Sequence, residues 1–243
     1  MSKRSRRVQL VGVACAAILL FVSCSQGASS KSNLALVDPT EELPARFKSQ
    51  EPVPKPDFST ASQSPAFQQA IKEAAALLGG QPRPLRSQAE DEEVSGGVSF
   101  DVPHNKVEAG LRQAHTDLLS KGFYLFRYEQ NFDINGKADK VGLLPTTDFY
   151  AVMAVMETNG DNYGIGTAGV IAWMKELQQE QPFILTGIGF DYLEGHFTGT
   201  VKDPSALAKR MYQFCPDIVD QGTESVNNLA RELEKGALYF WWD

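Results

Sequence analysis

The chain has 243 residues, of which 42% are hydrophobic, and a formal net charge of −7 at pH 7. It is long enough for one ordinary domain with a tail, and its acidic balance argues against nucleic acid as a partner, because two negative surfaces repel each other. Its three cysteines, Cys15, Cys24 and Cys215, are too far apart to form the CxxC pairs of a structural zinc site.

The N-terminus combines a basic start, a short apolar segment and a cysteine. Four basic residues within the first seven positions precede the mostly apolar residues 8–22. About 15 residues fit the core of a signal peptide and fall short of the roughly 20 that a membrane-crossing helix needs. Ser23 precedes Cys24, so residues 1–23 resemble a lipoprotein signal peptide, with Cys24 as the lipidated residue. An ordinary secretory signal cut near Ser23 or Ala28, or an uncleaved anchor, is the alternative.

Lipidation of Cys24 predicts a lipid-anchored protein of the bacterial cell envelope. Ser25 follows the cysteine instead of aspartate, and the resemblance to Gram-negative lipoproteins then implies the outer membrane, if the cell has one. Cys15 leaves with the signal peptide, so Cys215 has no partner for an intrachain disulfide. The remaining chain has 19 basic and 30 acidic residues, a formal charge of −11, and would be repelled by nucleic acid or by an anionic lipid surface.

Residues 24–97 are predicted to form a Pro- and Ser-rich tether. Eight of the 13 prolines fall there, and prolines break regular structure and stiffen a linker. A short helix near 65–78 interrupts the tether, because Ser64 and Pro65 are typical of a helix start and Gly79 of a helix end. Its apolar residues repeat at helical spacing, so this helix either packs on the domain or docks a partner.

Residues 98–243 are predicted to form an α+β domain. The apolar patterns predict strands at 98–102, 123–128, 140–144, 183–188, 192–198 and 237–242, with helices that begin near 107, 148, 167, 204 and 226. Asn135-Gly136 is a strong hairpin signal. Because this hairpin is embedded among interleaved helices and strands, we expect a mixed β-sheet with helices packed on it. The β-α-β units near both ends would allow a ferredoxin-like core.

Five segments carry a family resemblance: Leu144-Pro145-Thr146, Thr158 to Gly164, Phe190 to Gly195, Phe214 to Gly222, and Trp241-Trp242-Asp243. As a set they make residues 143–243 similar to the bacterial family known as domain of unknown function 4253. The resemblance implies a complete C-terminal domain. It brings no established activity, so it assigns no role to any residue, and the signal peptide and tether are not part of it.

Cys215 and His196 are the candidates for a catalytic pair. A reactive thiol needs a nearby histidine and a lowered pKa, and His196 is the histidine within residues 143–243. The alternative is structural: Cys215 stands between Phe214 and Pro216 at a helix end, where a free cysteine commonly serves as a small buried hydrophobic residue.

Acidic residues offer a second candidate site. Oxygen donors and one imidazole could gather from Asp191, Glu194, His196, Asp217 and Asp220. Turn and cap roles explain the same residues, because Asp217 and Asp220 lie between Pro216 and Gly222, where carboxylates bond backbone N–H groups. The spacing is not specific to a metal, so we predict neither a metal nor a cofactor.

A glycine-rich loop and the aromatic C-terminus could contact a ligand. The loop contains Asn159, Asn162 and Tyr163 but lacks the Lys-Ser/Thr of a phosphate-binding loop, and its glycines suit positive φ angles. Residues 239–242 carry aromatic side chains on both strand faces, which predicts a central strand buried on both sides. Alternatively a tryptophan, with Trp242 as the candidate, lines an exposed groove.

Three hypotheses for the function remain. The first is a noncatalytic module that binds another envelope protein, held near the membrane by a lipid and a tether. The second is a hydrolase or thiol enzyme that uses Cys215 with His196, or the acidic cluster of Asp191, Asp217 and Asp220. The third, by analogy with small acidic single-domain proteins, is an immunity-type protein that neutralises a toxin.

Overall fold

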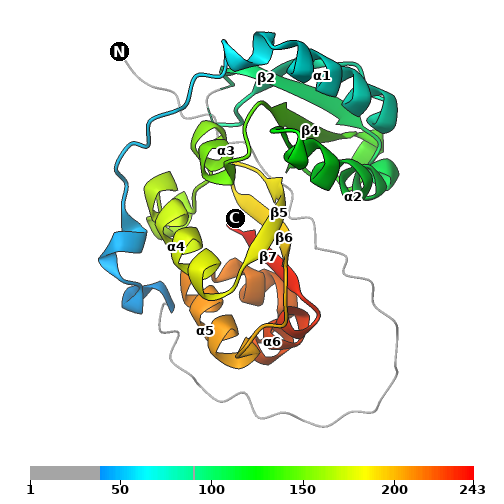
Figure 1. Ribbon diagram of the computed structural model, residues 1–243. Helices are drawn as coiled ribbons and strands as arrows, with labels where there is room; N and C mark the ends of the chain where they lie inside the picture. The colour runs from blue at the N-terminus through cyan, green and yellow to red at the C-terminus, as the bar shows by residue number, and fades with distance from the viewer. Residues whose placement is uncertain (1–38, 90) are drawn as a thin grey trace.

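A mixed seven-stranded sheet forms the centre of the molecule, with the strand order β1-β2-β4-β3-β5-β6-β7 (Figure 1). The computed structural model describes residues 39–89 and 91–243, so the predicted signal peptide, Cys24 and the start of the predicted tether lie outside the described residues. The strands are β1 Arg83–Arg86, β2 Glu93–Val102, β3 Tyr124–Glu129, β4 Asp139–Leu144, β5 Phe183–Ile188, β6 Tyr192–Phe197 and β7 Ala237–Trp241.

Six α-helices are present in the described part of the chain: α1 Pro65–Leu78, α2 His104–Ser120, α3 Phe149–Met156, α4 Thr167–Glu180, α5 Pro204–Phe214 and α6 Val226–Glu234. Side chains cap several of them as the sequence predicted. Ser64 accepts a hydrogen bond from the backbone N–H of Phe67, and Asp203 accepts one from that of Ala206. Within these residues, no helix combines the length and the hydropathy that a membrane-spanning segment requires.

The strand connections confirm the α+β prediction. β2 and β3 both pair antiparallel with β4, which lies between them, so β2-α2-β3-β4 is a split β-α-β unit. The ferredoxin-like arrangement goes no further, because the sheet continues from β3 to β5 through a parallel contact between Arg127 and Gly187. The hairpins β5-β6 and β6-β7 then complete the sheet with antiparallel pairs.

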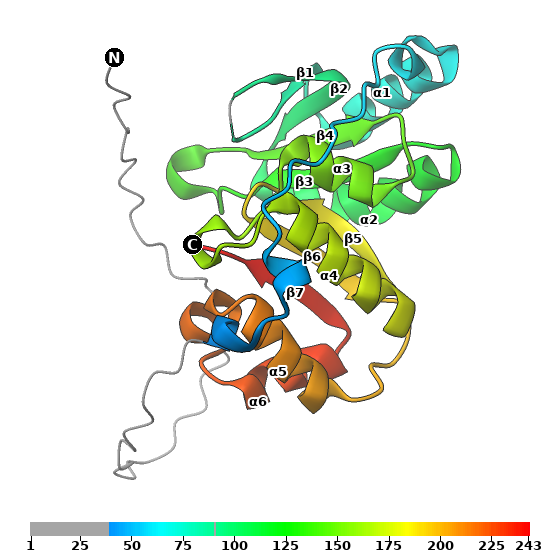
Figure 2. The same cartoon turned by 90° about the vertical axis from the view of Figure 1, so that its left-hand side faces the viewer.

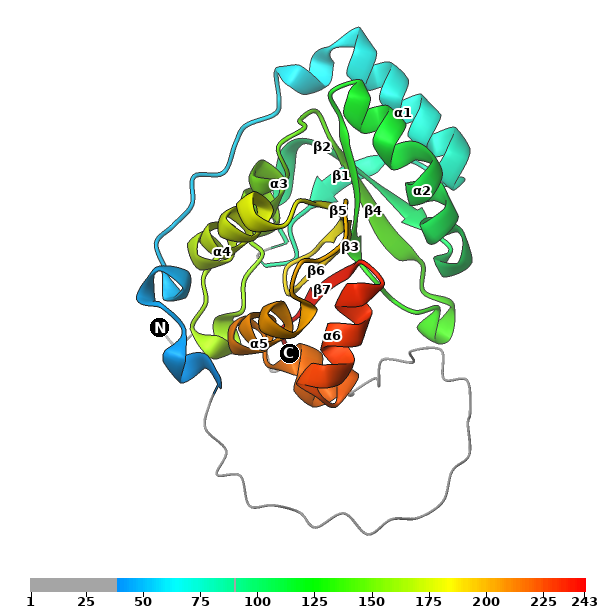
Figure 3. The same cartoon turned by 60° about the horizontal axis from the view of Figure 1, so that its bottom comes forward.

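Two groups of helices cover opposite faces of this sheet (Figure 3). On one face, Phe67 of α1 packs in a core with Phe100 of β2 and Leu125 of β3. On the other face, α3 to α6 share a larger core with Tyr124 and Phe126 of β3. The alternation along β3 shows why both cores form, since successive side chains of a strand point to opposite faces.

Much of residues 39–89 and 91–97, which the sequence assigned to the tether, packs against the domain. Leu43, Phe47 and Phe58 are buried in the larger core, and β1 and the start of β2 belong to the sheet. Figure 2 shows the segment before α1 running past α4 and α3 (blue to cyan). The sequence did not reveal this packing because three widely spaced apolar residues among prolines have neither helical nor strand periodicity.

The prediction of a central position for the last strand is wrong. β7 is an edge strand, paired with β6 alone within the sheet. Phe240 and Trp242 are buried on one face, whereas Tyr239 and Trp241 are half-buried on the other. Aromatic residues alternate on both faces, but α1 and α2 lie over β2, β4 and β3 and leave the second face of β7 without helical cover.

Candidate functional site

The loop between α3 and α4 is the part of the molecule where several of the predicted site residues meet. Glu157 ends α3 with a left-handed backbone, at φ 56°. The fully buried Thr158 hydroxyl donates to the carbonyl oxygen of Gly189 at 2.7 Å. The backbone N–H of Asn159 donates to the carbonyl oxygen of Phe190 at 2.8 Å. These bonds tie the loop to the β5–β6 turn, so its two sides present fixed surfaces.

One side of the loop faces a closed polar hub, which consists of Tyr163, Asp217, Gln221 and Asp243. The Asp217 side chain accepts hydrogen bonds from the Tyr163 hydroxyl at 2.7 Å, the Gln221 amide at 2.9 Å and the backbone N–H of Asp243 at 2.9 Å. Burial and the Asp217 carboxylate raise the pKa of Tyr163, so its hydroxyl stays protonated and remains a donor. Three donors from separate segments therefore converge on one buried carboxylate.

Trp242 packs against the same side of the loop. A Cβ atom at Gly160 would lie 2.7 Å from Cδ1 of Trp242, so the indole ring fits only against a glycine. The indole N–H donates to the carbonyl oxygen of Phe214 at 3.2 Å. Sequence reasoning singled out Tyr163, Asp217 and Trp242, and the structure brings them together. Their polar groups, however, form hydrogen bonds within the protein, so they stabilise the fold instead of facing a ligand.

Cys215 and His196 do not meet. Cys215 is fully buried, its thiol donates to the carbonyl oxygen of Trp241 at 2.9 Å, and burial raises the pKa of the thiol well above its ordinary value. His196 is exposed on β6 opposite Ala237, at the other end of β7 from Trp241. A buried, protonated thiol without a neighbouring imidazole lacks the features of an activated nucleophile.

The acidic candidates also occupy separate places. Asp220 accepts a hydrogen bond from the Tyr212 hydroxyl at 3.0 Å. Asn162, a candidate from the glycine-rich loop, is exposed and lies outside the polar hub. Burial, together with the nearby Asp243 carboxylate, raises the pKa of Asp191. Across residues 39–89 and 91–243, no three His, Cys, Asp or Glu side chains gather in a group that could hold a metal ion.

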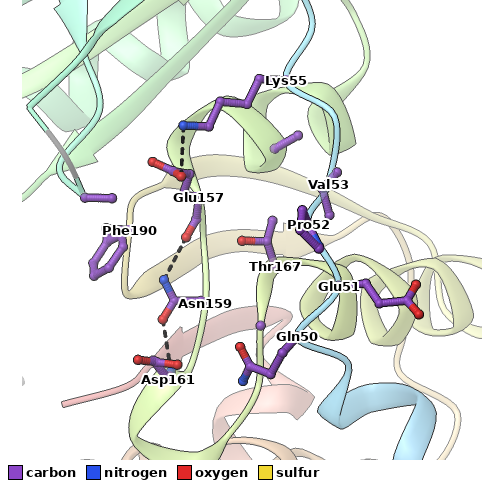
Figure 4. Close-up of a pocket in the computed structure, with 13 residues that line it drawn as sticks. Gln50, Glu51, Pro52, Val53, Lys55, Glu157, Asn159, Asp161, Thr167 and Phe190 are labelled. Carbon is purple, nitrogen blue, oxygen red and sulfur yellow. Dashed lines mark hydrogen bonds and ion pairs between the residues drawn. The ribbon is translucent and has the colours of Figure 1, made fainter.

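The other side of the loop faces a cavity of about 370 Å³ (Figure 4). One wall is the extended segment Gln50 to Lys55, and the opposite wall comes from the end of α3, the loop and Phe190 of the β5–β6 turn. The lining residues are Gln50, Glu51, Pro52, Val53, Lys55, Ala89, Ala154, Glu157, Asn159, Asp161, Gly166, Thr167 and Phe190. The two walls of the cavity thus come from segments that are about a hundred residues apart in the chain.

An ion pair and two amide hydrogen bonds organise the polar groups of the cavity. The Lys55 ammonium lies 2.9 Å from Oε1 of Glu157. The Asn159 side chain donates to the Glu157 carbonyl oxygen at 2.8 Å and accepts from the Asp161 N–H at 2.9 Å. Oε2 of Glu157 is buried and has no hydrogen-bond partner among residues 39–89 and 91–243. The described lining contains no histidine, cysteine or serine.

Residues 140–243 match the family described as a domain of unknown function, DUF4253. This match confirms the resemblance seen in the sequence. No match was found among curated proteins or among solved structures. The DUF4253 region contains the whole hub and the loop wall of the cavity, whereas the wall from Gln50 to Lys55 lies outside it.

A buried charge cluster joins the DUF4253 region to the strands before it. The Arg127 side chain, 5% exposed, pairs with Asp139, which is fully buried, and with Glu194 of β6. Asp139 also lies 2.8 Å from Nδ1 of His104 and accepts from the backbone N–H of Asn131 at 2.7 Å. Although burial alone would lower the pKa of Arg127, the two carboxylates raise it. The cluster therefore holds α2, β3, β4 and β6 together.

Sequence reasoning missed the Arg127 cluster and most of the cavity. Each member of the cluster comes from a different element, so no local spacing signals it. In the cavity, Asn159 was a candidate, but Lys55 stands in the proline-rich stretch and Glu157 in a helix end, where charged residues are common. The left-handed backbone at Glu157 is an unusual feature of the cavity, and it is visible only in the structure.

Proposed function

We propose that this protein is a noncatalytic module that binds another protein of the bacterial cell envelope, and that a lipid on Cys24 holds it there. The observation that carries the proposal is the cavity beside the Asn159 loop. Its volume of about 370 Å³ falls in the range typical of ligand pockets, about 300–1,000 Å³. A side chain or a short segment of a partner protein fits such a volume.

The composition of the cavity favours binding over catalysis. Pro52, Val53 and Phe190 supply apolar surface, and Asn159 and Thr167 supply polar groups. This mixture is typical of recognition sites, in which apolar contact gives affinity and a few polar groups give specificity. The separation of Cys215 from His196 further supports a noncatalytic role.

Site-specific photocrosslinking tests the binding site. A photoreactive phenylalanine replaces Val53 in the full-length protein, in the bacterium that produces it, and the matched control carries it at Lys235, an exposed residue outside the cavity. We expect a discrete crosslinked protein from position 53 only. Thr167→Trp, which fills the cavity, should abolish the crosslink in a protein that still folds. Equal crosslinking from both positions, or no effect of Thr167→Trp, would reject the site.

Membrane attachment is tested separately. Metabolic labelling with an alkyne-bearing fatty acid should mark the full-length protein, and Cys24→Ser should remove the label and release the protein from the membrane fraction. A labelled Cys24→Ser variant, or an unlabelled original protein, would reject lipidation at this residue.

A further inference from the structure

Glu157 is held at the cavity in an unusual state. Its backbone is left-handed, at φ 56°, a conformation that costs free energy for any residue except glycine. One carboxylate oxygen pairs with the Lys55 ammonium, while the other, Oε2, is buried without a hydrogen-bond partner in the part of the chain that the structure describes. An unpaired buried carboxylate oxygen is unfavourable, and a donor that reached it would relieve this cost. Oε2 has almost no accessible surface in this arrangement, so the Glu157 side chain, 25% exposed, must turn toward the cavity to meet a ligand.

The charges around the cavity favour a positively charged donor. The lining carries three carboxylates, from Glu51, Glu157 and Asp161, against the single ammonium of Lys55. Figure 4 shows the Glu51 carboxylate directed away from the cavity. The remaining pair of carboxylates still exceeds the one cation, and the Phe190 ring in the same lining adds a surface that attracts cations.

Apart from the Lys55 ammonium, which already pairs with Glu157, the start of α4 could attract an anion, because helix N-termini carry a partial positive charge. Gly166 and Thr167 at this end line the cavity. However, a Cβ atom at Gly166 would lie 2.6 Å from the carbonyl oxygen of Ser49, so the backbone of Ser49 already packs against this helix end. A carbonyl oxygen at the N-terminus offsets its positive potential and leaves less of it for an anion.

We propose that the cavity binds a cationic side chain, the guanidinium or ammonium group of an arginine or lysine on the partner. The inference rests on the proposed function and names the chemistry of its site. The Glu157 side chain turns toward the cavity so that Oε2 accepts from the cation, Asp161 adds to the negative potential, and Phe190 and Val53 contact the aliphatic stem. Lys55 shows that an ammonium at Glu157 is compatible with the fold, since it already occupies the other carboxylate oxygen.

The test uses N-acetyl-arginine methylamide as the probe and its citrulline counterpart as the uncharged isostere. Purified full-length protein in detergent micelles is titrated with each, and binding is followed by NMR of the backbone amides. We expect shifts at Asn159 and Thr167 with the arginine probe, and at least about tenfold weaker binding of the citrulline probe, because a charged donor to a buried carboxylate gives the stronger hydrogen bond.

Two substitutions with the same chemical change provide the matched control. Glu157→Gln should weaken binding of the arginine probe by about tenfold or more, whereas Glu51→Gln, on the outward-pointing side chain, should leave the Kd within about twofold. Lys55→Met provides an independent variant should Glu157→Gln fail to fold, and it should strengthen binding because both Glu157 oxygens become free. Weaker binding to Lys55→Met would overturn the proposal.

Three further outcomes would also overturn the cationic ligand: equal binding of the arginine and citrulline probes, equal effects of Glu157→Gln and Glu51→Gln, or preferential binding of N-acetyl-aspartate methylamide. A persistent crosslink from Val53 together with any of these results would reject the cationic ligand and retain protein binding at the cavity. Loss of the crosslink together with any of these results would reject both proposals.

Discussion

The two sides of the loop between α3 and α4 have opposite properties although they share a backbone. On the hub side, Asp217 accepts from three donors, and Trp242 packs against Gly160. On the cavity side, Glu157 keeps a buried oxygen to which no described residue donates a hydrogen bond. The hub satisfies its polar groups within the chain, and the cavity does not, so the hub can give stability and the cavity recognition.

The two sides also differ in where their parts come from. All members of the hub lie within residues 140–243, the DUF4253 region. The cavity is complete only when Gln50 to Lys55 lie across the loop, and this segment belongs to the stretch before α1. A rigid loop held by the hub thus presents one wall, and a peripheral segment supplies the other, an arrangement typical of binding sites on stable scaffolds.

The two adjacent tryptophans give the largest expected contrast. Trp242→Ala removes a buried ring that packs between Gly160 and Phe214, and should lower the free energy of unfolding by about 3–5 kcal/mol. Trp241→Ala, on the half-buried face of β7, should cost about 1 kcal/mol. Urea unfolding followed by circular dichroism measures both. Equal losses would show that the hub side is not the stabilising side.

Asp217→Asn tests the centre of the hub. An amide in place of the carboxylate turns one acceptor into a donor that faces existing donors, and should cost about 2 kcal/mol. Asp220→Asn, on an exposed carboxylate that accepts a hydrogen bond from the Tyr212 hydroxyl, should cost about 0.5 kcal/mol. Thermal unfolding compares the two, and a larger loss for Asp220→Asn would contradict the role assigned to Asp217.

Two loop glycines separate a steric effect from a backbone effect. Gly160 has φ −122°, which any residue adopts, so Gly160→Ala should cost about 1–3 kcal/mol only because its Cβ meets Trp242. Gly164 has φ 67° and open space around it, so Gly164→Ala should cost about 1 kcal/mol from backbone strain. In a Trp242→Ala background the Gly160→Ala cost should disappear, whereas that of Gly164→Ala should persist.

Local rules were sufficient to predict most helices and strands. Ser64 and Gly79 mark the ends of α1, and both carry the cap geometry that the sequence suggested. Asn135 and Gly136 are both left-handed in the β3–β4 connection, as an Asn-Gly hairpin signal implies, although the connection is longer than two residues. These features depend on backbone preferences of a few neighbouring residues, which the sequence contains directly.

Contacts between distant segments were not predictable in the same way. The burial of Phe47 depends on its contact with α4, and the edge position of β7 depends on which strands pair, and neither has a local pattern. The motifs around Tyr163, Asp217 and Trp242 were recognised in the sequence. Only the assembled fold shows that these residues contact one another, and that Lys55 and Glu157 line the cavity instead.

Lys55→Met gives the smallest expected effect and is the sharpest test of the cavity wall. The Lys55–Glu157 pair is partly exposed, with side-chain exposures of 40% and 25%, and exposed pairs contribute little to stability, so the substitution should change the free energy of unfolding by about 0.5 kcal/mol. Buried Phe47 and Phe58 would still hold the segment in place. A loss above about 2 kcal/mol in urea unfolding would show that the ion pair itself fixes this wall. The cavity side would then share the structural role of the hub, and the division of the loop into a stabilising and a recognising side would fail.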